Sequence, residues 1–360
     1  MAAFPMAKMR PAHDPADPPA LPRSEKGAPL FLGIDVGGTN IKIGLVDAEN
    51  ETVAYRSIPT EQQRGAADAA ERVGQTVRSL LQETNLPNDA IARACVATPG
   101  PMDIPAGVIL DPGNLPGWHN APVRDLMSNA CQLPMTYAND ANAAACGEFW
   151  AGAGRKYRSL VLFTMGTGIG GGIVVDDMLI EGVHSAGGEL GHIIVDCRDD
   201  APINGVGLRG TLEGFCGANA VVRRAEEAIA AGDASSLRRR LDQGEQLTPL
   251  MISEEADRGD QLAYDVVMET ARYMAIGVAT AVHTIDPECV VIGGAMTFGG
   301  DAHPLGRKFI ARLRDEARSR MISSVRDKVH IDFATLGGNA GYIGAAALAR
   351  REHRGAVLHR

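Results

Sequence analysis

The pattern of hydrophobic and polar positions changes sharply at Leu30. Residues 1–29 hold seven of the 20 prolines and show neither a helical period nor the alternation of a strand. They lack the apolar stretch of a secretory signal and are too rich in proline for a helix-turn-helix. We therefore expect a disordered leader over residues 1–29, with ordered structure starting at Leu30.

Two short apolar runs in LFLGIDVGGTNIKIGLVD, joined around residues 37–39, predict a hairpin with a glycine-rich tip. A helix is expected at about residues 66–84, followed by the buried strand IARACVATPG. A loop rich in glycine, proline and asparagine then continues to Trp118. Strands that alternate with helices indicate an α/β protein.

The hairpin pattern returns in SLVLFTMGTGIGGGIVVDD, where a shift of 129 residues superposes Gly37 on Gly166 and Asp47 on Asp176. The repeat predicts an internal duplication, the alternative being two units that share glycine by chance. Further along, CVVIGGAM predicts a buried strand, and residues 263–285 predict a long helix packed in the core.

Together these elements predict two α/β lobes that face a cleft. We place the N-terminal lobe at residues 30–138 and the C-terminal lobe at 139–349, which includes the segment 185–216 that holds the polar cluster described below. A terminal helix at 340–350 is expected to pack back on the N-terminal lobe, followed by a tail at 351–360.

Composition excludes several classes of protein. No apolar run is long enough to span a bilayer, and a net charge of -9 supplies no positive field for nucleic acid. The six cysteines form no CxxC pair, which predicts reduced thiols and a cytoplasmic protein. The 42 glycines suit an enzyme that handles phosphate, although alanine-rich helices explain the 4% of aromatic residues equally well.

The glycine motifs narrow the mode of phosphate binding. GTGIGGG has the spacing of a dinucleotide fingerprint but precedes a strand instead of a helix, and GxxxxGK[ST] does not occur, which excludes a P-loop. What remains is binding by backbone N–H groups at the two hairpin tips, which could clamp one nucleotide.

Two aspartates lie at strand ends near these tips. Asp35 is placed to hold a hydrated magnesium ion, although a capping or turn aspartate is the alternative. Asp140 follows Asn139 at the start of a helix, where it could accept the proton of an attacking hydroxyl. The Asn-Asp pair could also serve merely to begin that helix.

A third cluster spans SAGGELGHIIVD and GVGLRGTLEG. Its side chains Glu189, His192 and Glu213 could bracket the vicinal hydroxyls of a sugar with charge-assisted hydrogen bonds. A single Glu or His would more often lie on the surface without a function.

These motifs, in their order along the chain, resemble the ROK family of sugar kinases and sugar-responsive regulators from about residue 31 to residue 349. The resemblance rests on GIDVGGTNIKIGLVD, ATPGPMD, NLPGW, NDANAAACGE, GTGIGGGIVVD, GELGH, LEG and VIGGAM. It implies the two-lobed, duplicated actin/hexokinase-like (ribonuclease H-like) fold, with ATP, Mg²⁺ and a hexose in the central cleft. It further implies a homodimer or homotetramer.

The resemblance also assigns roles to residues, with Asp140 as the catalytic base. The sugar would contact Asn114, Asn139, Glu189, His192 and Glu213, the phosphates Gly38, Thr39, Thr167 and Gly168, and the adenosine Gly293 and Gly294.

One departure from the family concerns its zinc site, which combines the GH histidine with three cysteines. In this chain Asn204, Val206 and Thr211 stand at the cysteine positions. We therefore expect no structural zinc and a loop held by packing. The alternative is recruitment of Cys197 and Cys216, whose spacing differs.

The leading hypothesis is an ATP-dependent glucokinase that converts glucose to glucose 6-phosphate. Alternatives are a kinase of N-acetylmannosamine or N-acetylglucosamine, or a sugar-sensing regulator without a DNA-binding domain. A third alternative is a sugar binder without turnover, against which Asp35, Asp140 and both tips argue. The choice between ATP and polyphosphate as donor stays open.

Overall fold

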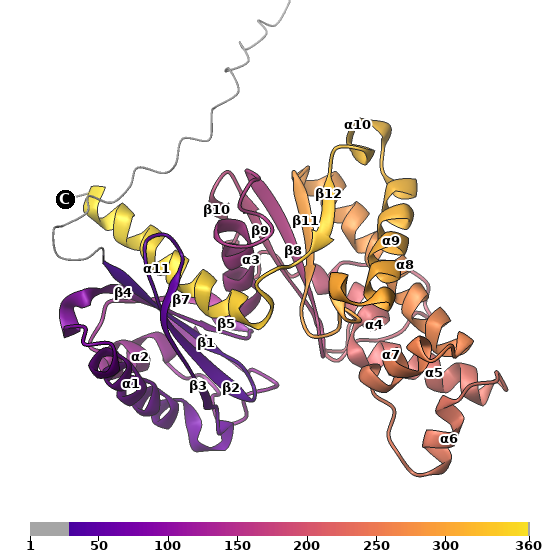
Figure 1. The fold of residues 1–360 in the computed structure, drawn as a ribbon, viewed down its shortest axis with the longest axis horizontal. Helices are drawn as coiled ribbons and strands as arrows, with labels where there is room; N and C mark the ends of the chain where they lie inside the picture. Colours follow the sequence, from indigo (N-terminus) through magenta and orange to yellow (C-terminus); the bar gives the residue numbers. More distant parts are fainter. Residues whose placement is uncertain (1–28, 359–360) are drawn as a thin grey trace, which may run out of the picture.

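The computed structural model describes residues 29–358, so residues 1–28 of the predicted leader lie outside the described residues. Figure 1 shows two α/β parts side by side, each built on a five-stranded sheet. The first sheet has the order β3-β2-β1-β4-β7 and the second the order β10-β9-β8-β11-β12. The strands of the first sheet are β1 (Leu30–Val36), β2 (Asn40–Val46), β3 (Thr52–Pro59), β4 (Ile91–Thr98) and β7 (Met135–Asn139). Those of the second are β8 (Ser159–Met165), β9 (Ile169–Val175), β10 (Met178–Leu179), β11 (Cys289–Gly293) and β12 (His330–Phe333).

The two sheets repeat one topology, which confirms the predicted duplication. In each, an antiparallel hairpin (β1-β2 or β8-β9) is extended by two parallel strands (β4 and β7, or β11 and β12). Shifted by 129 residues, the bounds of β1 and β2 coincide with those of β8 and β9. A small two-stranded sheet of β5 (Met102–Asp103) and β6 (Val108–Ile109) lies between β4 and β7 in sequence.

The first sheet is covered on both faces because the side chains of β1 alternate. Leu32, Ile34 and Val36 belong to the core cluster that contains α1 (Gly65–Glu83) and α2 (Val123–Cys131). The helix predicted at 66–84 is thus confirmed as α1. Gly33 points the other way, toward α11 (Ala340–Leu358), where a Cβ atom would lie 1.8 Å from the Tyr342 carbonyl oxygen.

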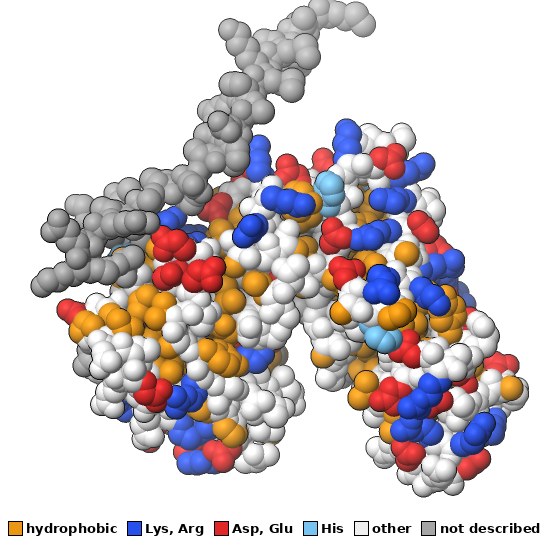
Figure 2. Space-filling view, in the orientation of Figure 1, with side chains coloured by type: hydrophobic (Ala, Val, Ile, Leu, Met, Phe, Trp, Pro, Cys, Tyr) orange, Lys and Arg blue, Asp and Glu red, His pale blue; other side chains and the backbone are white. Residues whose placement is uncertain are grey.

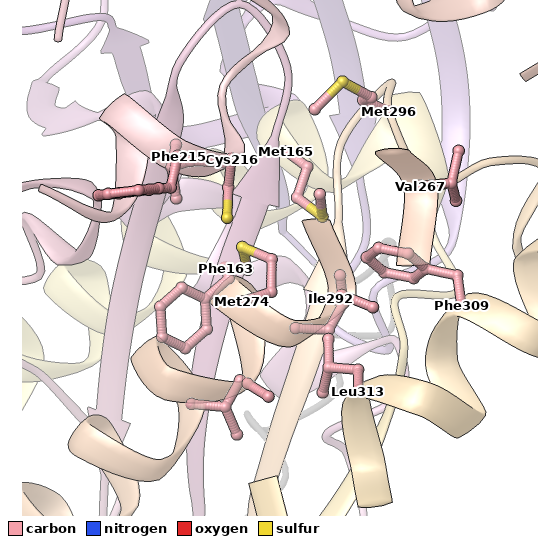
Figure 3. Close-up of a cluster of buried hydrophobic side chains, with 14 of the residues drawn as sticks. Phe163, Met165, Phe215, Cys216, Val267, Met274, Ile292, Met296, Phe309 and Leu313 are labelled. Carbon is pink, nitrogen blue, oxygen red and sulfur yellow. The ribbon is translucent and has the colours of Figure 1, made fainter. Parts of the chain in front are cut away.

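The second sheet packs on a larger helical layer (Figure 3). Phe163 of β8 and Ile292 of β11 lie against Met274 of α8 (Gln261–Ile285) and Phe309 of α9 (Pro304–Arg320). The long apolar helix predicted at 263–285 is therefore a core helix. The remaining helices of this part are α4 (Leu212–Cys216), α5 (Ala218–Ala230), α6 (Leu237–Asp242), α7 (Pro249–Asp257) and α10 (Ser323–Arg326). Short 3-10 turns occupy η1 (Gln62–Arg64), η2 (Asn88–Ala90), η3 (Leu190–His192), η4 (Gly300–Ala302) and η5 (Gly337–Asn339).

Two helices cross between the sheets, namely α3 (Asp140–Trp150) and α11 (Figure 1). Their backbones are in close contact, since a Cβ atom at Gly344 would lie 1.7 Å from the carbonyl oxygen of Ala143. The prediction for the chain end was too short, because α11 continues through most of the expected tail to Leu358. Arg350, at the predicted end of the helix, links α11 to the first part, since its guanidinium donates to the carbonyl of Ala48.

Among the described residues, no helix is both long and apolar enough to cross a membrane.

Candidate active site

A cleft of about 800 Å³ lies between the two parts and is lined by residues of both. Figure 2 shows the hollow that separates them on this face of the molecule. Most of the predicted site residues line this cleft, namely Asp35, Asn139, Asp140, Thr167, Gly168, Glu189, His192, Glu213, Gly293 and Gly294. The sequence motifs therefore converge in space, although they are spread over 260 residues.

The corner between β7 and α3 presents Asp140 to the cleft. Asn139 caps α3, since its Oδ1 accepts from the backbone N–H groups of Ala141 at 2.9 Å and Asn142 at 3.1 Å. Capping by Asn139 and catalysis by Asp140 are thus compatible, because the cap fixes the position of Asp140. Burial raises the pKa of Asp140 to about 6, and the charge of Asp35 adds to the effect.

Asp35 lies at the end of β1, directly opposite Lys42 of β2. Burial raises the pKa of Asp35, while the positive charge of Lys42 lowers it. A Cβ atom at Gly341 would lie 2.4 Å from Asp35 Oδ2, so the carboxylate lies against the first turn of α11. Lys42 Nζ donates to the carbonyl of Gly338 in the same region.

Lys42 was missed by the motif analysis. It is the one Lys or Arg among the described residues that line the cleft, which makes it a candidate for contact with phosphate. The sequence did not show that Lys42 faces Asp35, because that pairing depends on the register of the hairpin. A tip centred on Gly38 would pair Asp35 with Ile41, whereas the observed register pairs Asp35 with Lys42.

Glu189 and His192 occupy the turn that contains η3, on the side of the cleft formed by the second part. Their facing atoms, Glu189 Oε2 and His192 Nε2, are 3.8 Å apart, which is beyond hydrogen-bond distance. Both polar groups therefore remain available to a ligand with several hydroxyl groups.

Glu213 has a structural contact that the sequence did not indicate. One of its oxygens, Oε2, accepts from the backbone N–H of Ile169 at 3.0 Å. The same oxygen lies against Gly168, where a Cβ atom would be only 2.2 Å away. Glu213 thus fixes the second glycine tip from α4 while it lines the cleft.

The first tip lies beside the loop that contains Asn114. A Cβ atom at Gly38 would lie 3.3 Å from the carbonyl oxygen of Asn114. Gly38, Thr39 and Asn114 are not among the residues that line the cleft of 800 Å³. Their contacts with phosphate and sugar stay predictions.

The turn after β11 leads to a second, smaller cavity. Gly294 has a φ of 92° and packs on the backbone of Met165, where a Cβ atom would lie 2.2 Å from the carbonyl oxygen, so only glycine fits. The cavity holds about 280 Å³ and shares Gly166, Thr167 and Ala295 with the main cleft. Its walls also include the apolar side chains of Pro249, Leu250, Met296 and Phe298.

Glu148 ends the NDANAAACGE motif, and the motif analysis gave it no role. It is fully buried at the far end of α3, and its carboxylate accepts from the backbone N–H groups of Ala153, Thr335 and Leu336. These bonds tie α3 to the segment between β12 and η5, which lines the cleft. Its place in CGEFW resembles an ordinary helix-end carboxylate, so nothing local in the sequence indicated its partners.

The loop that replaces the zinc-binding segment is closed by side chains of this chain. Asn204 Oδ1 accepts from the backbone N–H groups of Val206 at 3.2 Å and Leu208 at 2.8 Å. Thr211 caps α4 by accepting from the N–H of Gly214. Hydrogen bonds between residues of this chain thus help to hold the loop, beside the burial of Asn204 and Thr211.

Cys197 and Cys216 differ in exposure, since Cys197 is exposed and Cys216 is buried. Among residues 29–358 no group of three or more His, Cys, Asp or Glu side chains is arranged to hold a metal ion. A magnesium ion needs fewer protein ligands than a structural zinc. The Asp35 carboxylate supplies the oxygen ligand that Mg²⁺ prefers, and water and phosphate oxygens commonly complete such a site.

Two α/β halves of one topology around a cleft with carboxylates and glycine-rich turns define the actin/hexokinase-like fold. The model of the ROK family matches residues 31–352, and the chain belongs to this family as a sugar kinase. It is 32% identical over 322 residues to the glucokinase of Halalkalibacterium halodurans, a match that covers 89% of this chain and 95% of the relative.

Solved structures agree with this assignment. The ROK hexokinase from Thermus thermophilus superposes with a TM-score of 0.77 at 29% identity, covering 91% of this chain and 99% of that chain. A ROK family glucokinase from Streptomyces griseus, solved in complex with glucose and AMPPNP, gives a TM-score of 0.70 at 29% identity. That match covers 89% of this chain and 99% of the other.

Proposed function

We propose that this protein transfers the γ-phosphoryl group of ATP to a hydroxyl of a hexose, with glucose as the substrate and glucose 6-phosphate as the product. The observation that carries the proposal is Asp140, a carboxyl group with a pKa of about 6 that lines one cleft with the Glu189–His192 pair and the second glycine tip. Such a group is ionised at neutral pH and is still basic enough to accept a proton.

The step proceeds by direct transfer. The sugar hydroxyl oxygen attacks the γ-phosphorus, the bond between that phosphorus and the ADP oxygen breaks, and the hydroxyl proton passes to Asp140. Lys42 and the backbone N–H groups of the second tip would hold the phosphates. Bound magnesium, held by Asp35 through water, would neutralise charge on the phosphate oxygens.

The second cavity supports ATP over polyphosphate as the donor. Its apolar wall of Leu250, Met296 and Phe298 suits the faces of a purine ring better than a chain of phosphates. It adjoins Thr167 and the turn after β11, so a nucleoside there would direct its phosphates into the main cleft.

An ADP-release screen tests the substrate. Glucose, mannose, fructose, N-acetylmannosamine and N-acetylglucosamine are each offered with ATP and with polyphosphate. We expect the highest kcat/KM for glucose with ATP. Turnover of an N-acetylated hexosamine in preference to glucose would support the alternative kinase, and no turnover of any sugar would contradict the proposal.

The assignment of the base is tested with Asp140→Asn. The amide keeps the oxygen that accepts from the N–H of Ala141 but cannot take up a proton. We expect turnover to fall by roughly 10²-fold or more while sugar binding persists. A variant that phosphorylates the sugar at close to the parent rate would show that Asp140 is not the base.

A further inference from the structure

The Asn204 side chain connects the loop without zinc ligands to the candidate sugar site. It is 9% exposed, and its Oδ1 accepts from the two backbone N–H groups of Val206 and Leu208. The backbone of Asn204 adds two more bonds, donating to the Leu208 carbonyl at 2.9 Å and accepting from Gly207 at 3.1 Å. Asn204 is therefore held firmly in one orientation.

The chemistry of these partners decides which end of the amide faces His192. Backbone N–H groups can only donate, so the atom that meets them must be the carbonyl oxygen. The opposite atom is then the amino nitrogen, which can only donate. It lies 3.2 Å from His192 Nδ1. Nδ1 must accept this bond, which leaves the imidazole neutral with its proton on Nε2.

We propose that Asn204 is a positioning residue that holds His192 in its Nε2–H tautomer, so that the ring donates a hydrogen bond to a sugar hydroxyl beside Glu189. The proposal rests on the proposed function for its sugar, but the tautomer itself does not depend on any substrate. In this chain an amide thus orients the imidazole, at a position where the resembling family has a metal-binding cysteine.

The geometry gives the tautomer a consequence for recognition. His192 Nε2 lies 3.8 Å from Glu189 Oε2, and both residues line the cleft. An Nε2–H donor next to a carboxylate acceptor matches a ligand that accepts at one atom and donates at another, as vicinal hydroxyls do. With the proton on Nδ1 the site would present two acceptors instead and lose this match.

Asn204→Asp separates the two functions of the amide. Its carboxylate retains an oxygen for the N–H groups of Val206 and Leu208, so the loop keeps its hydrogen bonds. It replaces the amino group by an acceptor, so a neutral His192 ring must move its proton to Nδ1 to complete the contact, and Nε2 then no longer donates. Asn129→Asp, on the exposed surface of α2, is the matched control for the added negative charge.

The direct measurement is a long-range ¹H–¹⁵N correlation spectrum of the full chain labelled at histidine, recorded without sugar or nucleotide. The signals of His192 are those that His192→Gln removes. We expect the Nε2–H pattern in the parent and in Asn129→Asp, and a protonated Nδ1 in Asn204→Asp. An Nδ1–H tautomer in the parent, or an unchanged pattern in Asn204→Asp, overturns the proposal.

Kinetics supply the second readout. We expect Asn204→Asp to raise the KM for the hexose by roughly tenfold while the KM for ATP stays within about twofold, because one donor to the sugar is lost. Equal rises in both constants would indicate a general loss of structure and count against positioning. If the parent phosphorylates no hexose, the proposed function fails while the spectrum still tests the tautomer.

Discussion

Asp140 shows how one carboxyl group acquires the properties of a base from its surroundings. Burial has the largest effect on its pKa, the charges of Asp35 and Glu189 raise it further, and the backbone N–H of Ala141 lowers it. Asp140 in turn contributes to the raised pKa of Tyr137 on the same strand end. These groups come from three separate segments, so the ionisation of Asp140 is a property of the assembled cleft.

The pH dependence of the reaction follows from this pKa. Below about pH 6 a growing fraction of Asp140 is protonated and cannot accept the hydroxyl proton. We expect kcat/KM for the hexose to fall about tenfold per pH unit well below pH 6 and to level off above pH 7. Initial rates between pH 4.5 and 8.5 at constant ionic strength measure it. A flat profile through pH 6 would argue against Asp140 as the ionising group.

The same shift predicts that Asp140 lowers the stability of the fold. Its pKa in the folded protein, about 6, lies above the ordinary value of 3.8, so the folded state binds the proton more tightly. That stabilisation is complete below pH 3.8 and is lost as the pH rises through 6. At pH 8 the ionised Asp140 lowers the free energy of unfolding by at most about 3 kcal/mol. Because Asp140 is partly exposed to solvent in the cleft, we expect a decrease of about 1 to 2 kcal/mol.

Asp140→Asn should therefore raise Tm at pH 8 by a few degrees. At pH 4 parent and variant should unfold at nearly equal temperatures, because the parent side chain is then largely protonated. Thermal unfolding at the two pH values measures the difference. A variant less stable than the parent at pH 8 would mean that the ionised carboxylate stabilises the fold.

Among the elements, the loop between η3 and α4 is held by backbone bridges and by one side-chain turn. Isolated bridges pair Ile194 with Thr211 and Ile203 with Arg209, and Asn204 closes the turn between the second pair. A backbone network of this kind needs no ion to hold its shape.

We accordingly expect well below one zinc ion per chain after dialysis, and an unchanged Tm in the presence of a chelator. Elemental analysis and thermal unfolding provide the two measurements. A zinc content near one per chain together with a lower Tm on chelation would show that another ligand set, such as His192 with Cys197 and Cys216, has assembled.

Elements were predicted best where their pattern is local. The alternation in β1 and its repeat in β8 gave the strand bounds and the duplication, because strand periodicity is carried by adjacent residues. The last helix was predicted to end at residue 350, whereas α11 continues to Leu358. Arg350 of this helix donates to the Ala48 carbonyl, which is 302 positions away in the chain.

Residues of the candidate site were likewise predicted where a local motif contained them. Asp140, Glu189 and His192 were predicted from motifs whose residue types suit the chemistry, and the structure places them in one cleft. Lys42 depended on a one-residue register, and Asn204 depended on a contact with His192 that only the folded loop creates. Relations of this kind arise from tertiary structure and leave no trace in local sequence.

At the scale of the whole molecule, the close crossing of α3 and α11 joins the two parts. Gly147 and Gly344 allow it, since a Cβ atom on either would lie within 2.3 Å of a carbonyl oxygen on the other helix. The first helix begins at Asp140 and the second begins beside Asp35. The crossing therefore sets the relative position of the two carboxylates.

Gly344→Ala should destabilise the protein strongly. The added methyl group would overlap the Ala143 carbonyl, and the helices must separate, which we expect to lower the free energy of unfolding by about 3 kcal/mol. Gly355→Ala is the control in the same helix, because none of the described atoms lies within 4 Å of its Cβ position. It should be neutral or stabilising by about 0.5 to 1 kcal/mol. Denaturant unfolding of both variants measures this, and equal stabilities would refute a tight crossing.

The unequal tips of the two repeated hairpins have a consequence for the direction in which a ligand enters. Four residues separate the last paired residues of the first hairpin, Val36 and Ile41, and three separate those of the second. The charged pair Asp35–Lys42 has Thr164–Gly170 as its counterpart in the second copy. Two identical copies would create a nearly symmetric cleft, in which a nucleotide could lie in either of two opposite senses with similar energy. A charged pair in one copy alone removes this degeneracy, and so a duplicated fold acquires a single polarity.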